Sequence, residues 1–215
     1  MEPQDFASAL ITELESLPEL KTAPMRKVRR EYSKRLRSED ANYVFEVAQA
    51  ILDSGQHRWI AYELIRDHPA AFHSLDRNRL EALGHGINSW SSVDSFSRTL
   101  SGPAWREGRI TIDTIRDWAQ SEDHWWRRTA LVSTVALNVR SHGGRGDVSN
   151  TLSICEMLIE DHDDMVVKAL SWALRELVVH DPKAVDKFIS SHDNVLAARV
   201  KREVRNKLET GLKNP

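Results

Sequence analysis

Apolar residues recur every three to four positions along most of the chain, and no stretch alternates convincingly between apolar and polar residues. This pattern predicts an all-α protein. Glycine or proline marks most of the breaks, including Gly102-Pro103, and Pro182 suits a first helical turn, where its missing N–H would have no partner anyway. The predicted helices cover residues 3–17, 24–38, 40–53, 57–67, 76–85, 90–100, 108–120, 124–140, 148–161, 163–180, 182–191 and 194–212.

Similar segments open three of these helices. They begin at His57 (His-Arg-Trp-Ile-Ala), His124 (His-Trp-Trp-Arg-Arg) and Asp164 (Asp-Met-Val-Val-Lys). Their starts fit one skipped and one adjacent repeat of roughly 33–40 residues, which is the period of helix-pair repeats. Stacked helix pairs form α-solenoids with long concave surfaces. The sequence therefore favours an α-solenoid over a right-angled helical bundle.

Length and composition describe an ordinary globular protein. The chain has 215 residues, 40% of them apolar and 29% charged, so one domain is expected. No apolar run is long enough to span a membrane, and the acidic N-terminus does not look like a signal peptide. A lone cysteine, Cys155, cannot form an internal disulfide or by itself hold a zinc ion. We therefore expect a cytoplasmic protein without a metal or other cofactor.

Charge is unevenly distributed, although the formal net charge of −2 is low for a nucleic-acid-binding protein. Residues 1–20 are acidic, whereas residues 21–38 and the C-terminal segment from residue 199 are strongly basic. The two basic segments could form two edges of one anion-binding groove, or they could be solvated helix faces. The cations from these segments that we expect to contact DNA are Arg26, Lys27, Arg30, Lys34, Lys201, Arg202 and Arg205.

Trp172 lies away from the apolar stripe of the helix predicted over residues 163–180. Its neighbours at helical spacing include Lys168 and Arg175. An aromatic ring between two cations suits a DNA groove, because the cations meet phosphates while the ring contacts a sugar or base. The alternative is a tryptophan that covers a neighbouring helix. The predicted core positions of this helix are Val166, Val167, Leu170, Ala173, Leu174 and Leu177.

Two charged residues need partners or a local explanation. Arg128 projects from an otherwise apolar helical stripe, so it requires a carboxylate or a phosphate, and a structural salt bridge is the commoner outcome. Asp94 lies one turn after Trp90 in a helix that Ser89 or Asn88 can cap, where an acidic residue also suits the helix dipole. The acidic run over residues 160–164 fits a solvated turn better than a metal site.

Three segments together resemble the AlkD-type DNA alkylation repair enzymes, a family of HEAT-like repeat DNA glycosylases. Trp90-Ser-Ser-Val-Asp94 is similar to the family's Trp-x-x-x-Asp motif, Trp125-Trp-Arg-Arg128 to its Trp-x-x-Arg segment, and Trp172-Ala-Leu-Arg175-Glu to its second tryptophan segment. Each motif is weak alone, but their order and spacing together are fairly specific. The resemblance extends loosely from about residue 24 to residue 205.

The resemblance implies a single curved domain of HEAT-like repeats over residues 1–215, working as a monomer that grips duplex DNA and associates with the nucleoid. It implies base excision repair, in which N3- and N7-alkylated purines such as 3-methyladenine and 7-methylguanine are removed without base flipping. Asp94 would be the catalytic carboxylate, Trp90 and Trp172 would cradle the deoxyribose, and Arg128 would hold the site and contact the DNA backbone. Lys168 and Arg175 would join the DNA-binding cations.

Two other functions stay open on the sequence alone. The same scaffold could bind damaged or branched DNA without cleaving it, in which case strong, salt-sensitive affinity would accompany no base release. It could also be a protein-interaction solenoid, which is the commonest use of such repeats. In the glycosylase hypothesis, an arginine close to Asp94 is expected to keep the pKa of the Asp94 carboxyl low, so that the group stays charged.

Overall fold

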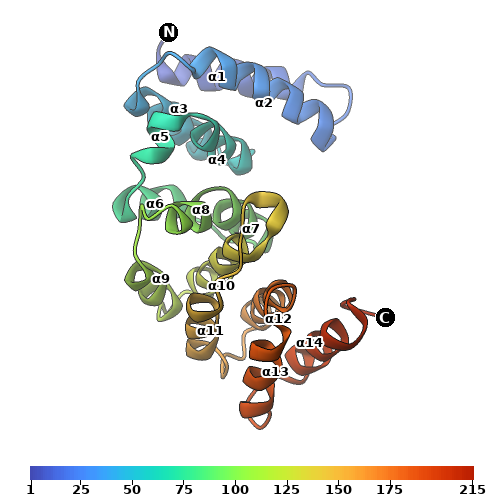
Figure 1. Ribbon diagram of the computed structural model, residues 1–215. Coiled ribbons are helices and arrows are strands. Elements are labelled where there is room, and N and C mark those ends of the chain that lie inside the picture. Colours follow the sequence, from blue (N-terminus) through green and yellow to red (C-terminus); the bar gives the residue numbers. More distant parts are fainter. The chain divides into compact units, whose positions relative to one another are not determined.

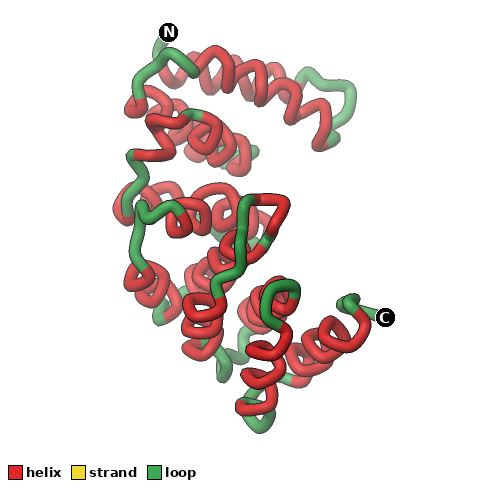
Figure 2. The backbone as a smooth tube through the Cα atoms, viewed as in Figure 1, coloured by secondary structure: helices red, strands yellow, loops and turns green.

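The computed structural model describes residues 1–215, and its backbone consists of helices and connecting loops without a β-strand (Figure 2). This confirms the all-α prediction, and within residues 86–215 the helices stack in pairs as in an α-solenoid. None of them is both long and apolar enough to cross a lipid bilayer. The chain divides into two compact units, residues 1–85 and residues 86–215.

The first unit is a stack of amphipathic helices. In it α1 packs against α2 and α3, and α4 packs against α2 and α3. Phe6 meets Tyr32 edge to face, with ring centroids 5.2 Å apart, inside the core of this stack. The pattern of apolar residues missed α5, because a five-residue helix is too short to show a period. The helices are α1 (Pro3–Glu15), α2 (Thr22–Leu36), α3 (Ala41–Asp53), α4 (Arg58–Asp67), α5 (Pro69–His73) and α6 (Arg77–Gly84), labelled in Figure 1.

The second unit contains three consecutive helix pairs, which follow α7 (Trp90–Phe96), the π-helix η1 (Ser97–Ser101) and α8 (Gly102–Arg106). The second helices of the pairs form one layer, in which α10 packs on α12 and α12 on α14, while α9 contacts α11 in the other layer. The short 3-10 helix η2 (Arg140–His142) follows α10. The pairs are α9 (Ile112–Ala119) with α10 (His124–Asn138), α11 (Val148–Met157) with α12 (Asp164–Val178), and α13 (Pro182–Ser191) with α14 (Ala198–Thr210).

Several local predictions are confirmed in this unit. Pro182 begins α13, and the six predicted core positions of α12 are all buried. Segments that resemble one another in sequence open α10 and α12, which lie side by side in the same layer. The repeat signal therefore marked corresponding helices of adjacent pairs.

The predicted break at Gly102-Pro103 is wrong, because the chain remains helical from Trp90 to Arg106. The turn before Pro103 is a π-turn, in which the Gly102 N–H bonds to the Ser97 carbonyl. Pro103 follows this π-turn directly, so its lack of an N–H falls where the regular hydrogen-bond pattern is already interrupted. Gly102 is required for packing, since a Cβ atom there would lie only 2.5 Å from the Ala136 Cβ on α10.

Candidate active site

Aromatic packing fixes the C-terminal end of helix α7 against α10, and a side-chain cap stabilises its N-terminal end. The Ser89 hydroxyl accepts a hydrogen bond from the Ser92 N–H at 3.3 Å, which confirms the predicted cap. Phe96 packs edge to face on Trp126, whose ring in turn lies 5.0 Å from that of Trp118 on α9. These contacts fix the direction in which Asp94 projects from α7.

Asp94 and Arg128 form an ion pair between α7 and α10. Both the Nε and the Nη2 of Arg128 donate to the same oxygen of Asp94, Oδ1, at 3.1 and 2.8 Å. The third nitrogen, Nη1, donates to the Met165 carbonyl at 2.6 Å, at the start of α12. The Arg128 side chain is only 6% exposed and that of Asp94 is 18% exposed. Arg128 therefore ties three helices together, and Oδ2 of Asp94 is left without a hydrogen-bond partner.

Burial raises the pKa of Asp94 above its ordinary value, while Arg128 and then Arg98 act to lower it. The expectation that a nearby arginine keeps this pKa low is therefore wrong in its net direction. The physical reason is that packing α7 onto α10 removes water from the carboxylate, and this desolvation outweighs the attraction of the guanidinium groups.

Trp172 lies half-buried on α12, outside the core set, as the sequence predicted. Its Nε1 donates to the Glu176 carboxylate at 2.9 Å. The guanidinium carbon of Arg98 in η1 lies over the indole, 5.8 Å from the ring centroid, and Arg98 Nη2 donates to His142 Nε2 at 3.1 Å. Arg98 therefore links the tryptophan of α12 to the segment that carries Asp94.

Trp90 begins α7 one helical turn before Asp94 and is 58% exposed. It makes no ring contact or hydrogen bond with the other predicted site residues. The structure thus joins Asp94 to Arg128 by direct contact, brings Arg98 to Trp172, and leaves the Trp90 indole open to solvent on the helix that carries Asp94.

Arg98 is the site residue that the sequence analysis missed. A usable signal existed, because Trp90, Asp94 and Arg98 follow one another at intervals of four residues and share one helix face.

Most of the cations predicted to bind DNA form ion pairs within the protein. Lys27, Arg30 and Arg202 make none and are exposed to solvent. Ion pairing lowers the charge available for a polyanion but does not remove it at the surface. The paired residues are Arg26 with Glu63, Lys34 with Glu31, Lys168 with Asp164, Arg175 with Glu203, and both Lys201 and Arg205 with Asp193.

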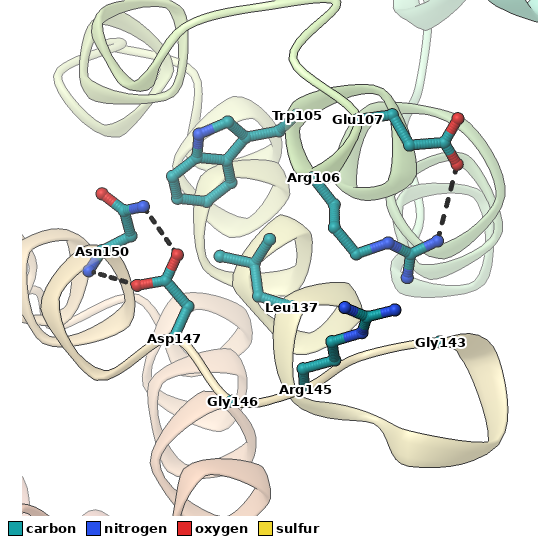
Figure 3. Close-up of a pocket in the computed structure, with 9 residues that line it drawn as sticks. All are labelled: Trp105, Arg106, Glu107, Leu137, Gly143, Arg145, Gly146, Asp147 and Asn150. Atoms are coloured by element: carbon teal, nitrogen blue, oxygen red, sulfur yellow. Dashed lines mark hydrogen bonds and ion pairs between the residues drawn. The ribbon is translucent and has the colours of Figure 1, made fainter.

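A separate pocket of about 480 Å³ is lined in part by the loop that follows α10 (Figure 3). Trp105 and Leu137 supply apolar walls, while Arg106 and Arg145 supply cations. None of the predicted catalytic residues lines this pocket. The pocket is linked to the candidate site only through Arg106, which also donates to the carbonyl of His142.

The side chains support neither a metal site nor a reactive cysteine. No group of three or more His, Cys, Asp or Glu residues is arranged to hold a metal ion. Cys155 is fully buried, and burial strongly raises the pKa of its thiol, so it stays protonated and unreactive. Asp161 and Asp163 of the acidic run bond to Arg127 and to the N-terminal turn of α12 respectively.

Comparison with known proteins gives one match. Residues 15–208 match the family model described as DNA alkylation repair enzyme. Searches of curated proteins and of solved structures give no significant match.

Proposed function

This chain belongs to the DNA alkylation repair enzyme family, and we propose that it is a DNA glycosylase for cationic N3- and N7-alkylated purines. Family membership assigns it to the repair of alkylated DNA, with DNA as its substrate. The proposal adds the reaction, which is hydrolysis of the N-glycosidic bond in duplex DNA, and the lesions, such as 3-methyladenine and 7-methylguanine. The base is expected to stay in the stack, as the resemblance to the AlkD-type enzymes implies.

The chemistry of these lesions limits what the protein must supply. Alkylation at N3 or N7 makes the purine cationic, so it departs as a neutral base and needs no general acid. Positive charge then moves onto the deoxyribose as the bond breaks. A fixed carboxylate can stabilise that charge and orient a water molecule for attack at C1′.

The observation that carries the proposal is the contact between Asp94 and Arg128. Because Arg128 bonds only to Oδ1, it fixes the carboxylate group while Oδ2 keeps its lone pairs for a substrate. This differs from the bidentate geometry that arginine and carboxylate often adopt, in which both oxygens are used. Partial exposure of Asp94 supports access of a sugar to the free oxygen.

The remaining roles follow from position and charge. In this proposal Arg128 acts by positioning Asp94, since its three nitrogens all bond within the protein. Trp90 and Trp172 contact the deoxyribose, where each aromatic face adds about 0.5–2 kcal/mol of cation–π stabilisation as the sugar becomes cationic.

The direct test is release of base from methylated duplex DNA. Purified protein, without added metal, is expected to release 7-methylguanine or 3-methyladenine faster than the spontaneous rate, as measured by chromatography of the free bases. Release no faster than the spontaneous rate would contradict the proposal. Salt-sensitive DNA binding without release would instead indicate a non-catalytic DNA-binding protein.

The pH profile of release is expected to report Asp94. Only the carboxylate stabilises a cationic sugar, so the rate should fall as pH decreases through the pKa of Asp94. Because burial raises that pKa, the fall should begin at a higher pH than for an exposed aspartate. Single-turnover rates in a series of acidic buffers, corrected for spontaneous depurination, measure how the rate of release depends on pH. A profile that stays flat down to about pH 4, where exposed aspartates titrate, would argue against the assignment.

A further inference from the structure

Arg98 is an exposed cation that is held in place only by neutral groups. Its guanidinium donates to the His142 ring at 3.1 Å and lies over the Trp172 indole. It forms no ion pair with a carboxylate, and Asp94, whose pKa it acts to lower, already bonds to Arg128. The full charge of Arg98 is therefore available to an anion from outside the protein.

This arrangement differs from that of most arginines in residues 86–215. They pair with acidic side chains, which lowers the charge that they offer to an external anion. The contacts of Arg98 instead orient its guanidinium. Neutral contacts that fix a guanidinium without neutralising it are suited to binding phosphate, for which its planar fork is well shaped. The paired arginines are Arg106, Arg116, Arg127, Arg128, Arg175, Arg199 and Arg205.

His142 is itself fixed by the packing of its loop. Arg106 donates to the His142 carbonyl at 2.7 Å, and His180 donates to the Asn138 carbonyl at 2.6 Å where the loop leaves α10. Burial lowers the pKa of His142, with Arg98 and Arg106 acting in the same direction. A neutral imidazole can accept the hydrogen bond from Arg98, whereas an imidazolium cannot.

From these contacts we propose that Arg98, oriented by His142, binds the backbone phosphate attached to the deoxyribose of the damaged nucleotide. This inference rests on the proposed function, which places that sugar against Trp172. Because Arg98 contacts the same indole, its guanidinium lies where a phosphate linked to that sugar would come.

Charge gives a second reason for this role. An unneutralised guanidinium near Asp94 would oppose the positive charge that develops on the sugar, because like charges repel. A bound phosphate removes that repulsion.

The first test measures DNA binding rather than base release. The probe is a duplex with a stable abasic-site analogue, and its affinity is measured by fluorescence anisotropy over a range of salt concentrations. Arg98→Gln should lower the affinity about 10-fold and reduce the salt slope by about 0.9, the value expected for one lost phosphate contact. Arg98→Lys should keep most of the slope, since it keeps the charge.

A matched control is Arg116→Gln, which removes an exposed arginine of α9 that pairs with Asp113 at 3.1 Å. It should bind as the wild type does. His142→Leu should weaken binding, and His142→Gln should restore it, because a glutamine oxygen can accept from Arg98. Circular dichroism checks that each variant is folded. A salt slope of Arg98→Gln equal to that of the wild type would overturn the inference.

The second test locates the phosphate. Neutral methylphosphonates replace the phosphates on either side of the abasic-site analogue, one at a time. One of them should weaken binding of the wild type and have no effect on Arg98→Gln. Equal penalties for both proteins at every position would refute a contact by Arg98.

The two proposals can fail separately. A wild type that binds through Arg98 but releases no base would contradict the glycosylase and leave this contact standing. A wild type that releases base while Arg98→Gln keeps its salt slope and its methylphosphonate penalties would refute the contact alone.

Discussion

Replacing Asp94 with asparagine should lower the rate of 7-methylguanine release by about 100- to 1,000-fold, the cost typical of removing one preorganised electrostatic group from an active site. Asparagine has nearly the same shape and can still accept from Arg128, but it carries no negative charge to stabilise a cationic sugar. Single-turnover release from methylated duplex DNA, with enzyme in excess, measures the effect on the chemical step.

Loss of folding has to be separated from loss of chemistry in this experiment, and the chain offers a matched control. Asp161 accepts from Arg127 at 2.6 Å, and its side chain is 10% exposed. Asp161→Asn therefore removes a comparable carboxylate from the neighbouring arginine of α10. It should lose stability as Asp94→Asn does but keep its rate of release. Equal release by Asp94→Asn and wild type would show that Asp94 is a structural residue.

Replacing Arg128 with methionine should destabilise the protein by about 3–5 kcal/mol, because it leaves the Asp94 carboxylate partly buried without its counter-charge. It also removes the donor to the Met165 carbonyl and so loosens α12 against α10. For a protein of this size the melting temperature should fall by about 2–4 °C per kcal/mol. Circular dichroism recorded during thermal unfolding measures this fall in melting temperature.

A double variant tests whether this cost comes from the ion pair. Asp94→Leu combined with Arg128→Met removes both charges and should be more stable than Arg128→Met alone, because no charge is left buried without a partner. If the losses of stability in the single variants Asp94→Leu and Arg128→Met simply add in the double variant, the contact between Asp94 and Arg128 does not account for the destabilisation.

Local pattern was enough to predict most of the helices and several details within them. The spacing of apolar residues depends on the 3.6-residue turn, so it located α10 and α12 and the buried face of α12 without any knowledge of packing. Caps are equally local, which is why Ser89 and Pro182 were placed correctly. The π-turn before Pro103 was missed because it depends on Gly102 packing closely against α10.

The motif residues of the site were also visible in the sequence, but their partners were not. Arg128 plainly needed an anion, yet nothing local identifies Asp94, 34 positions away, as that anion. Only the tertiary structure shows that Arg128 uses a single oxygen of Asp94, or that Arg98 lies over Trp172.

The sequence by itself determined the helical class, the family resemblance and the motif side chains proposed to carry the chemistry, because helix formation and motif identity depend on neighbours along the chain. The tertiary structure decided which charges are neutralised, which carboxylate oxygen is free and in which direction the pKa of Asp94 moves. Those properties depend on desolvation and on contacts between helices distant in sequence, and they exist only once the helices have packed.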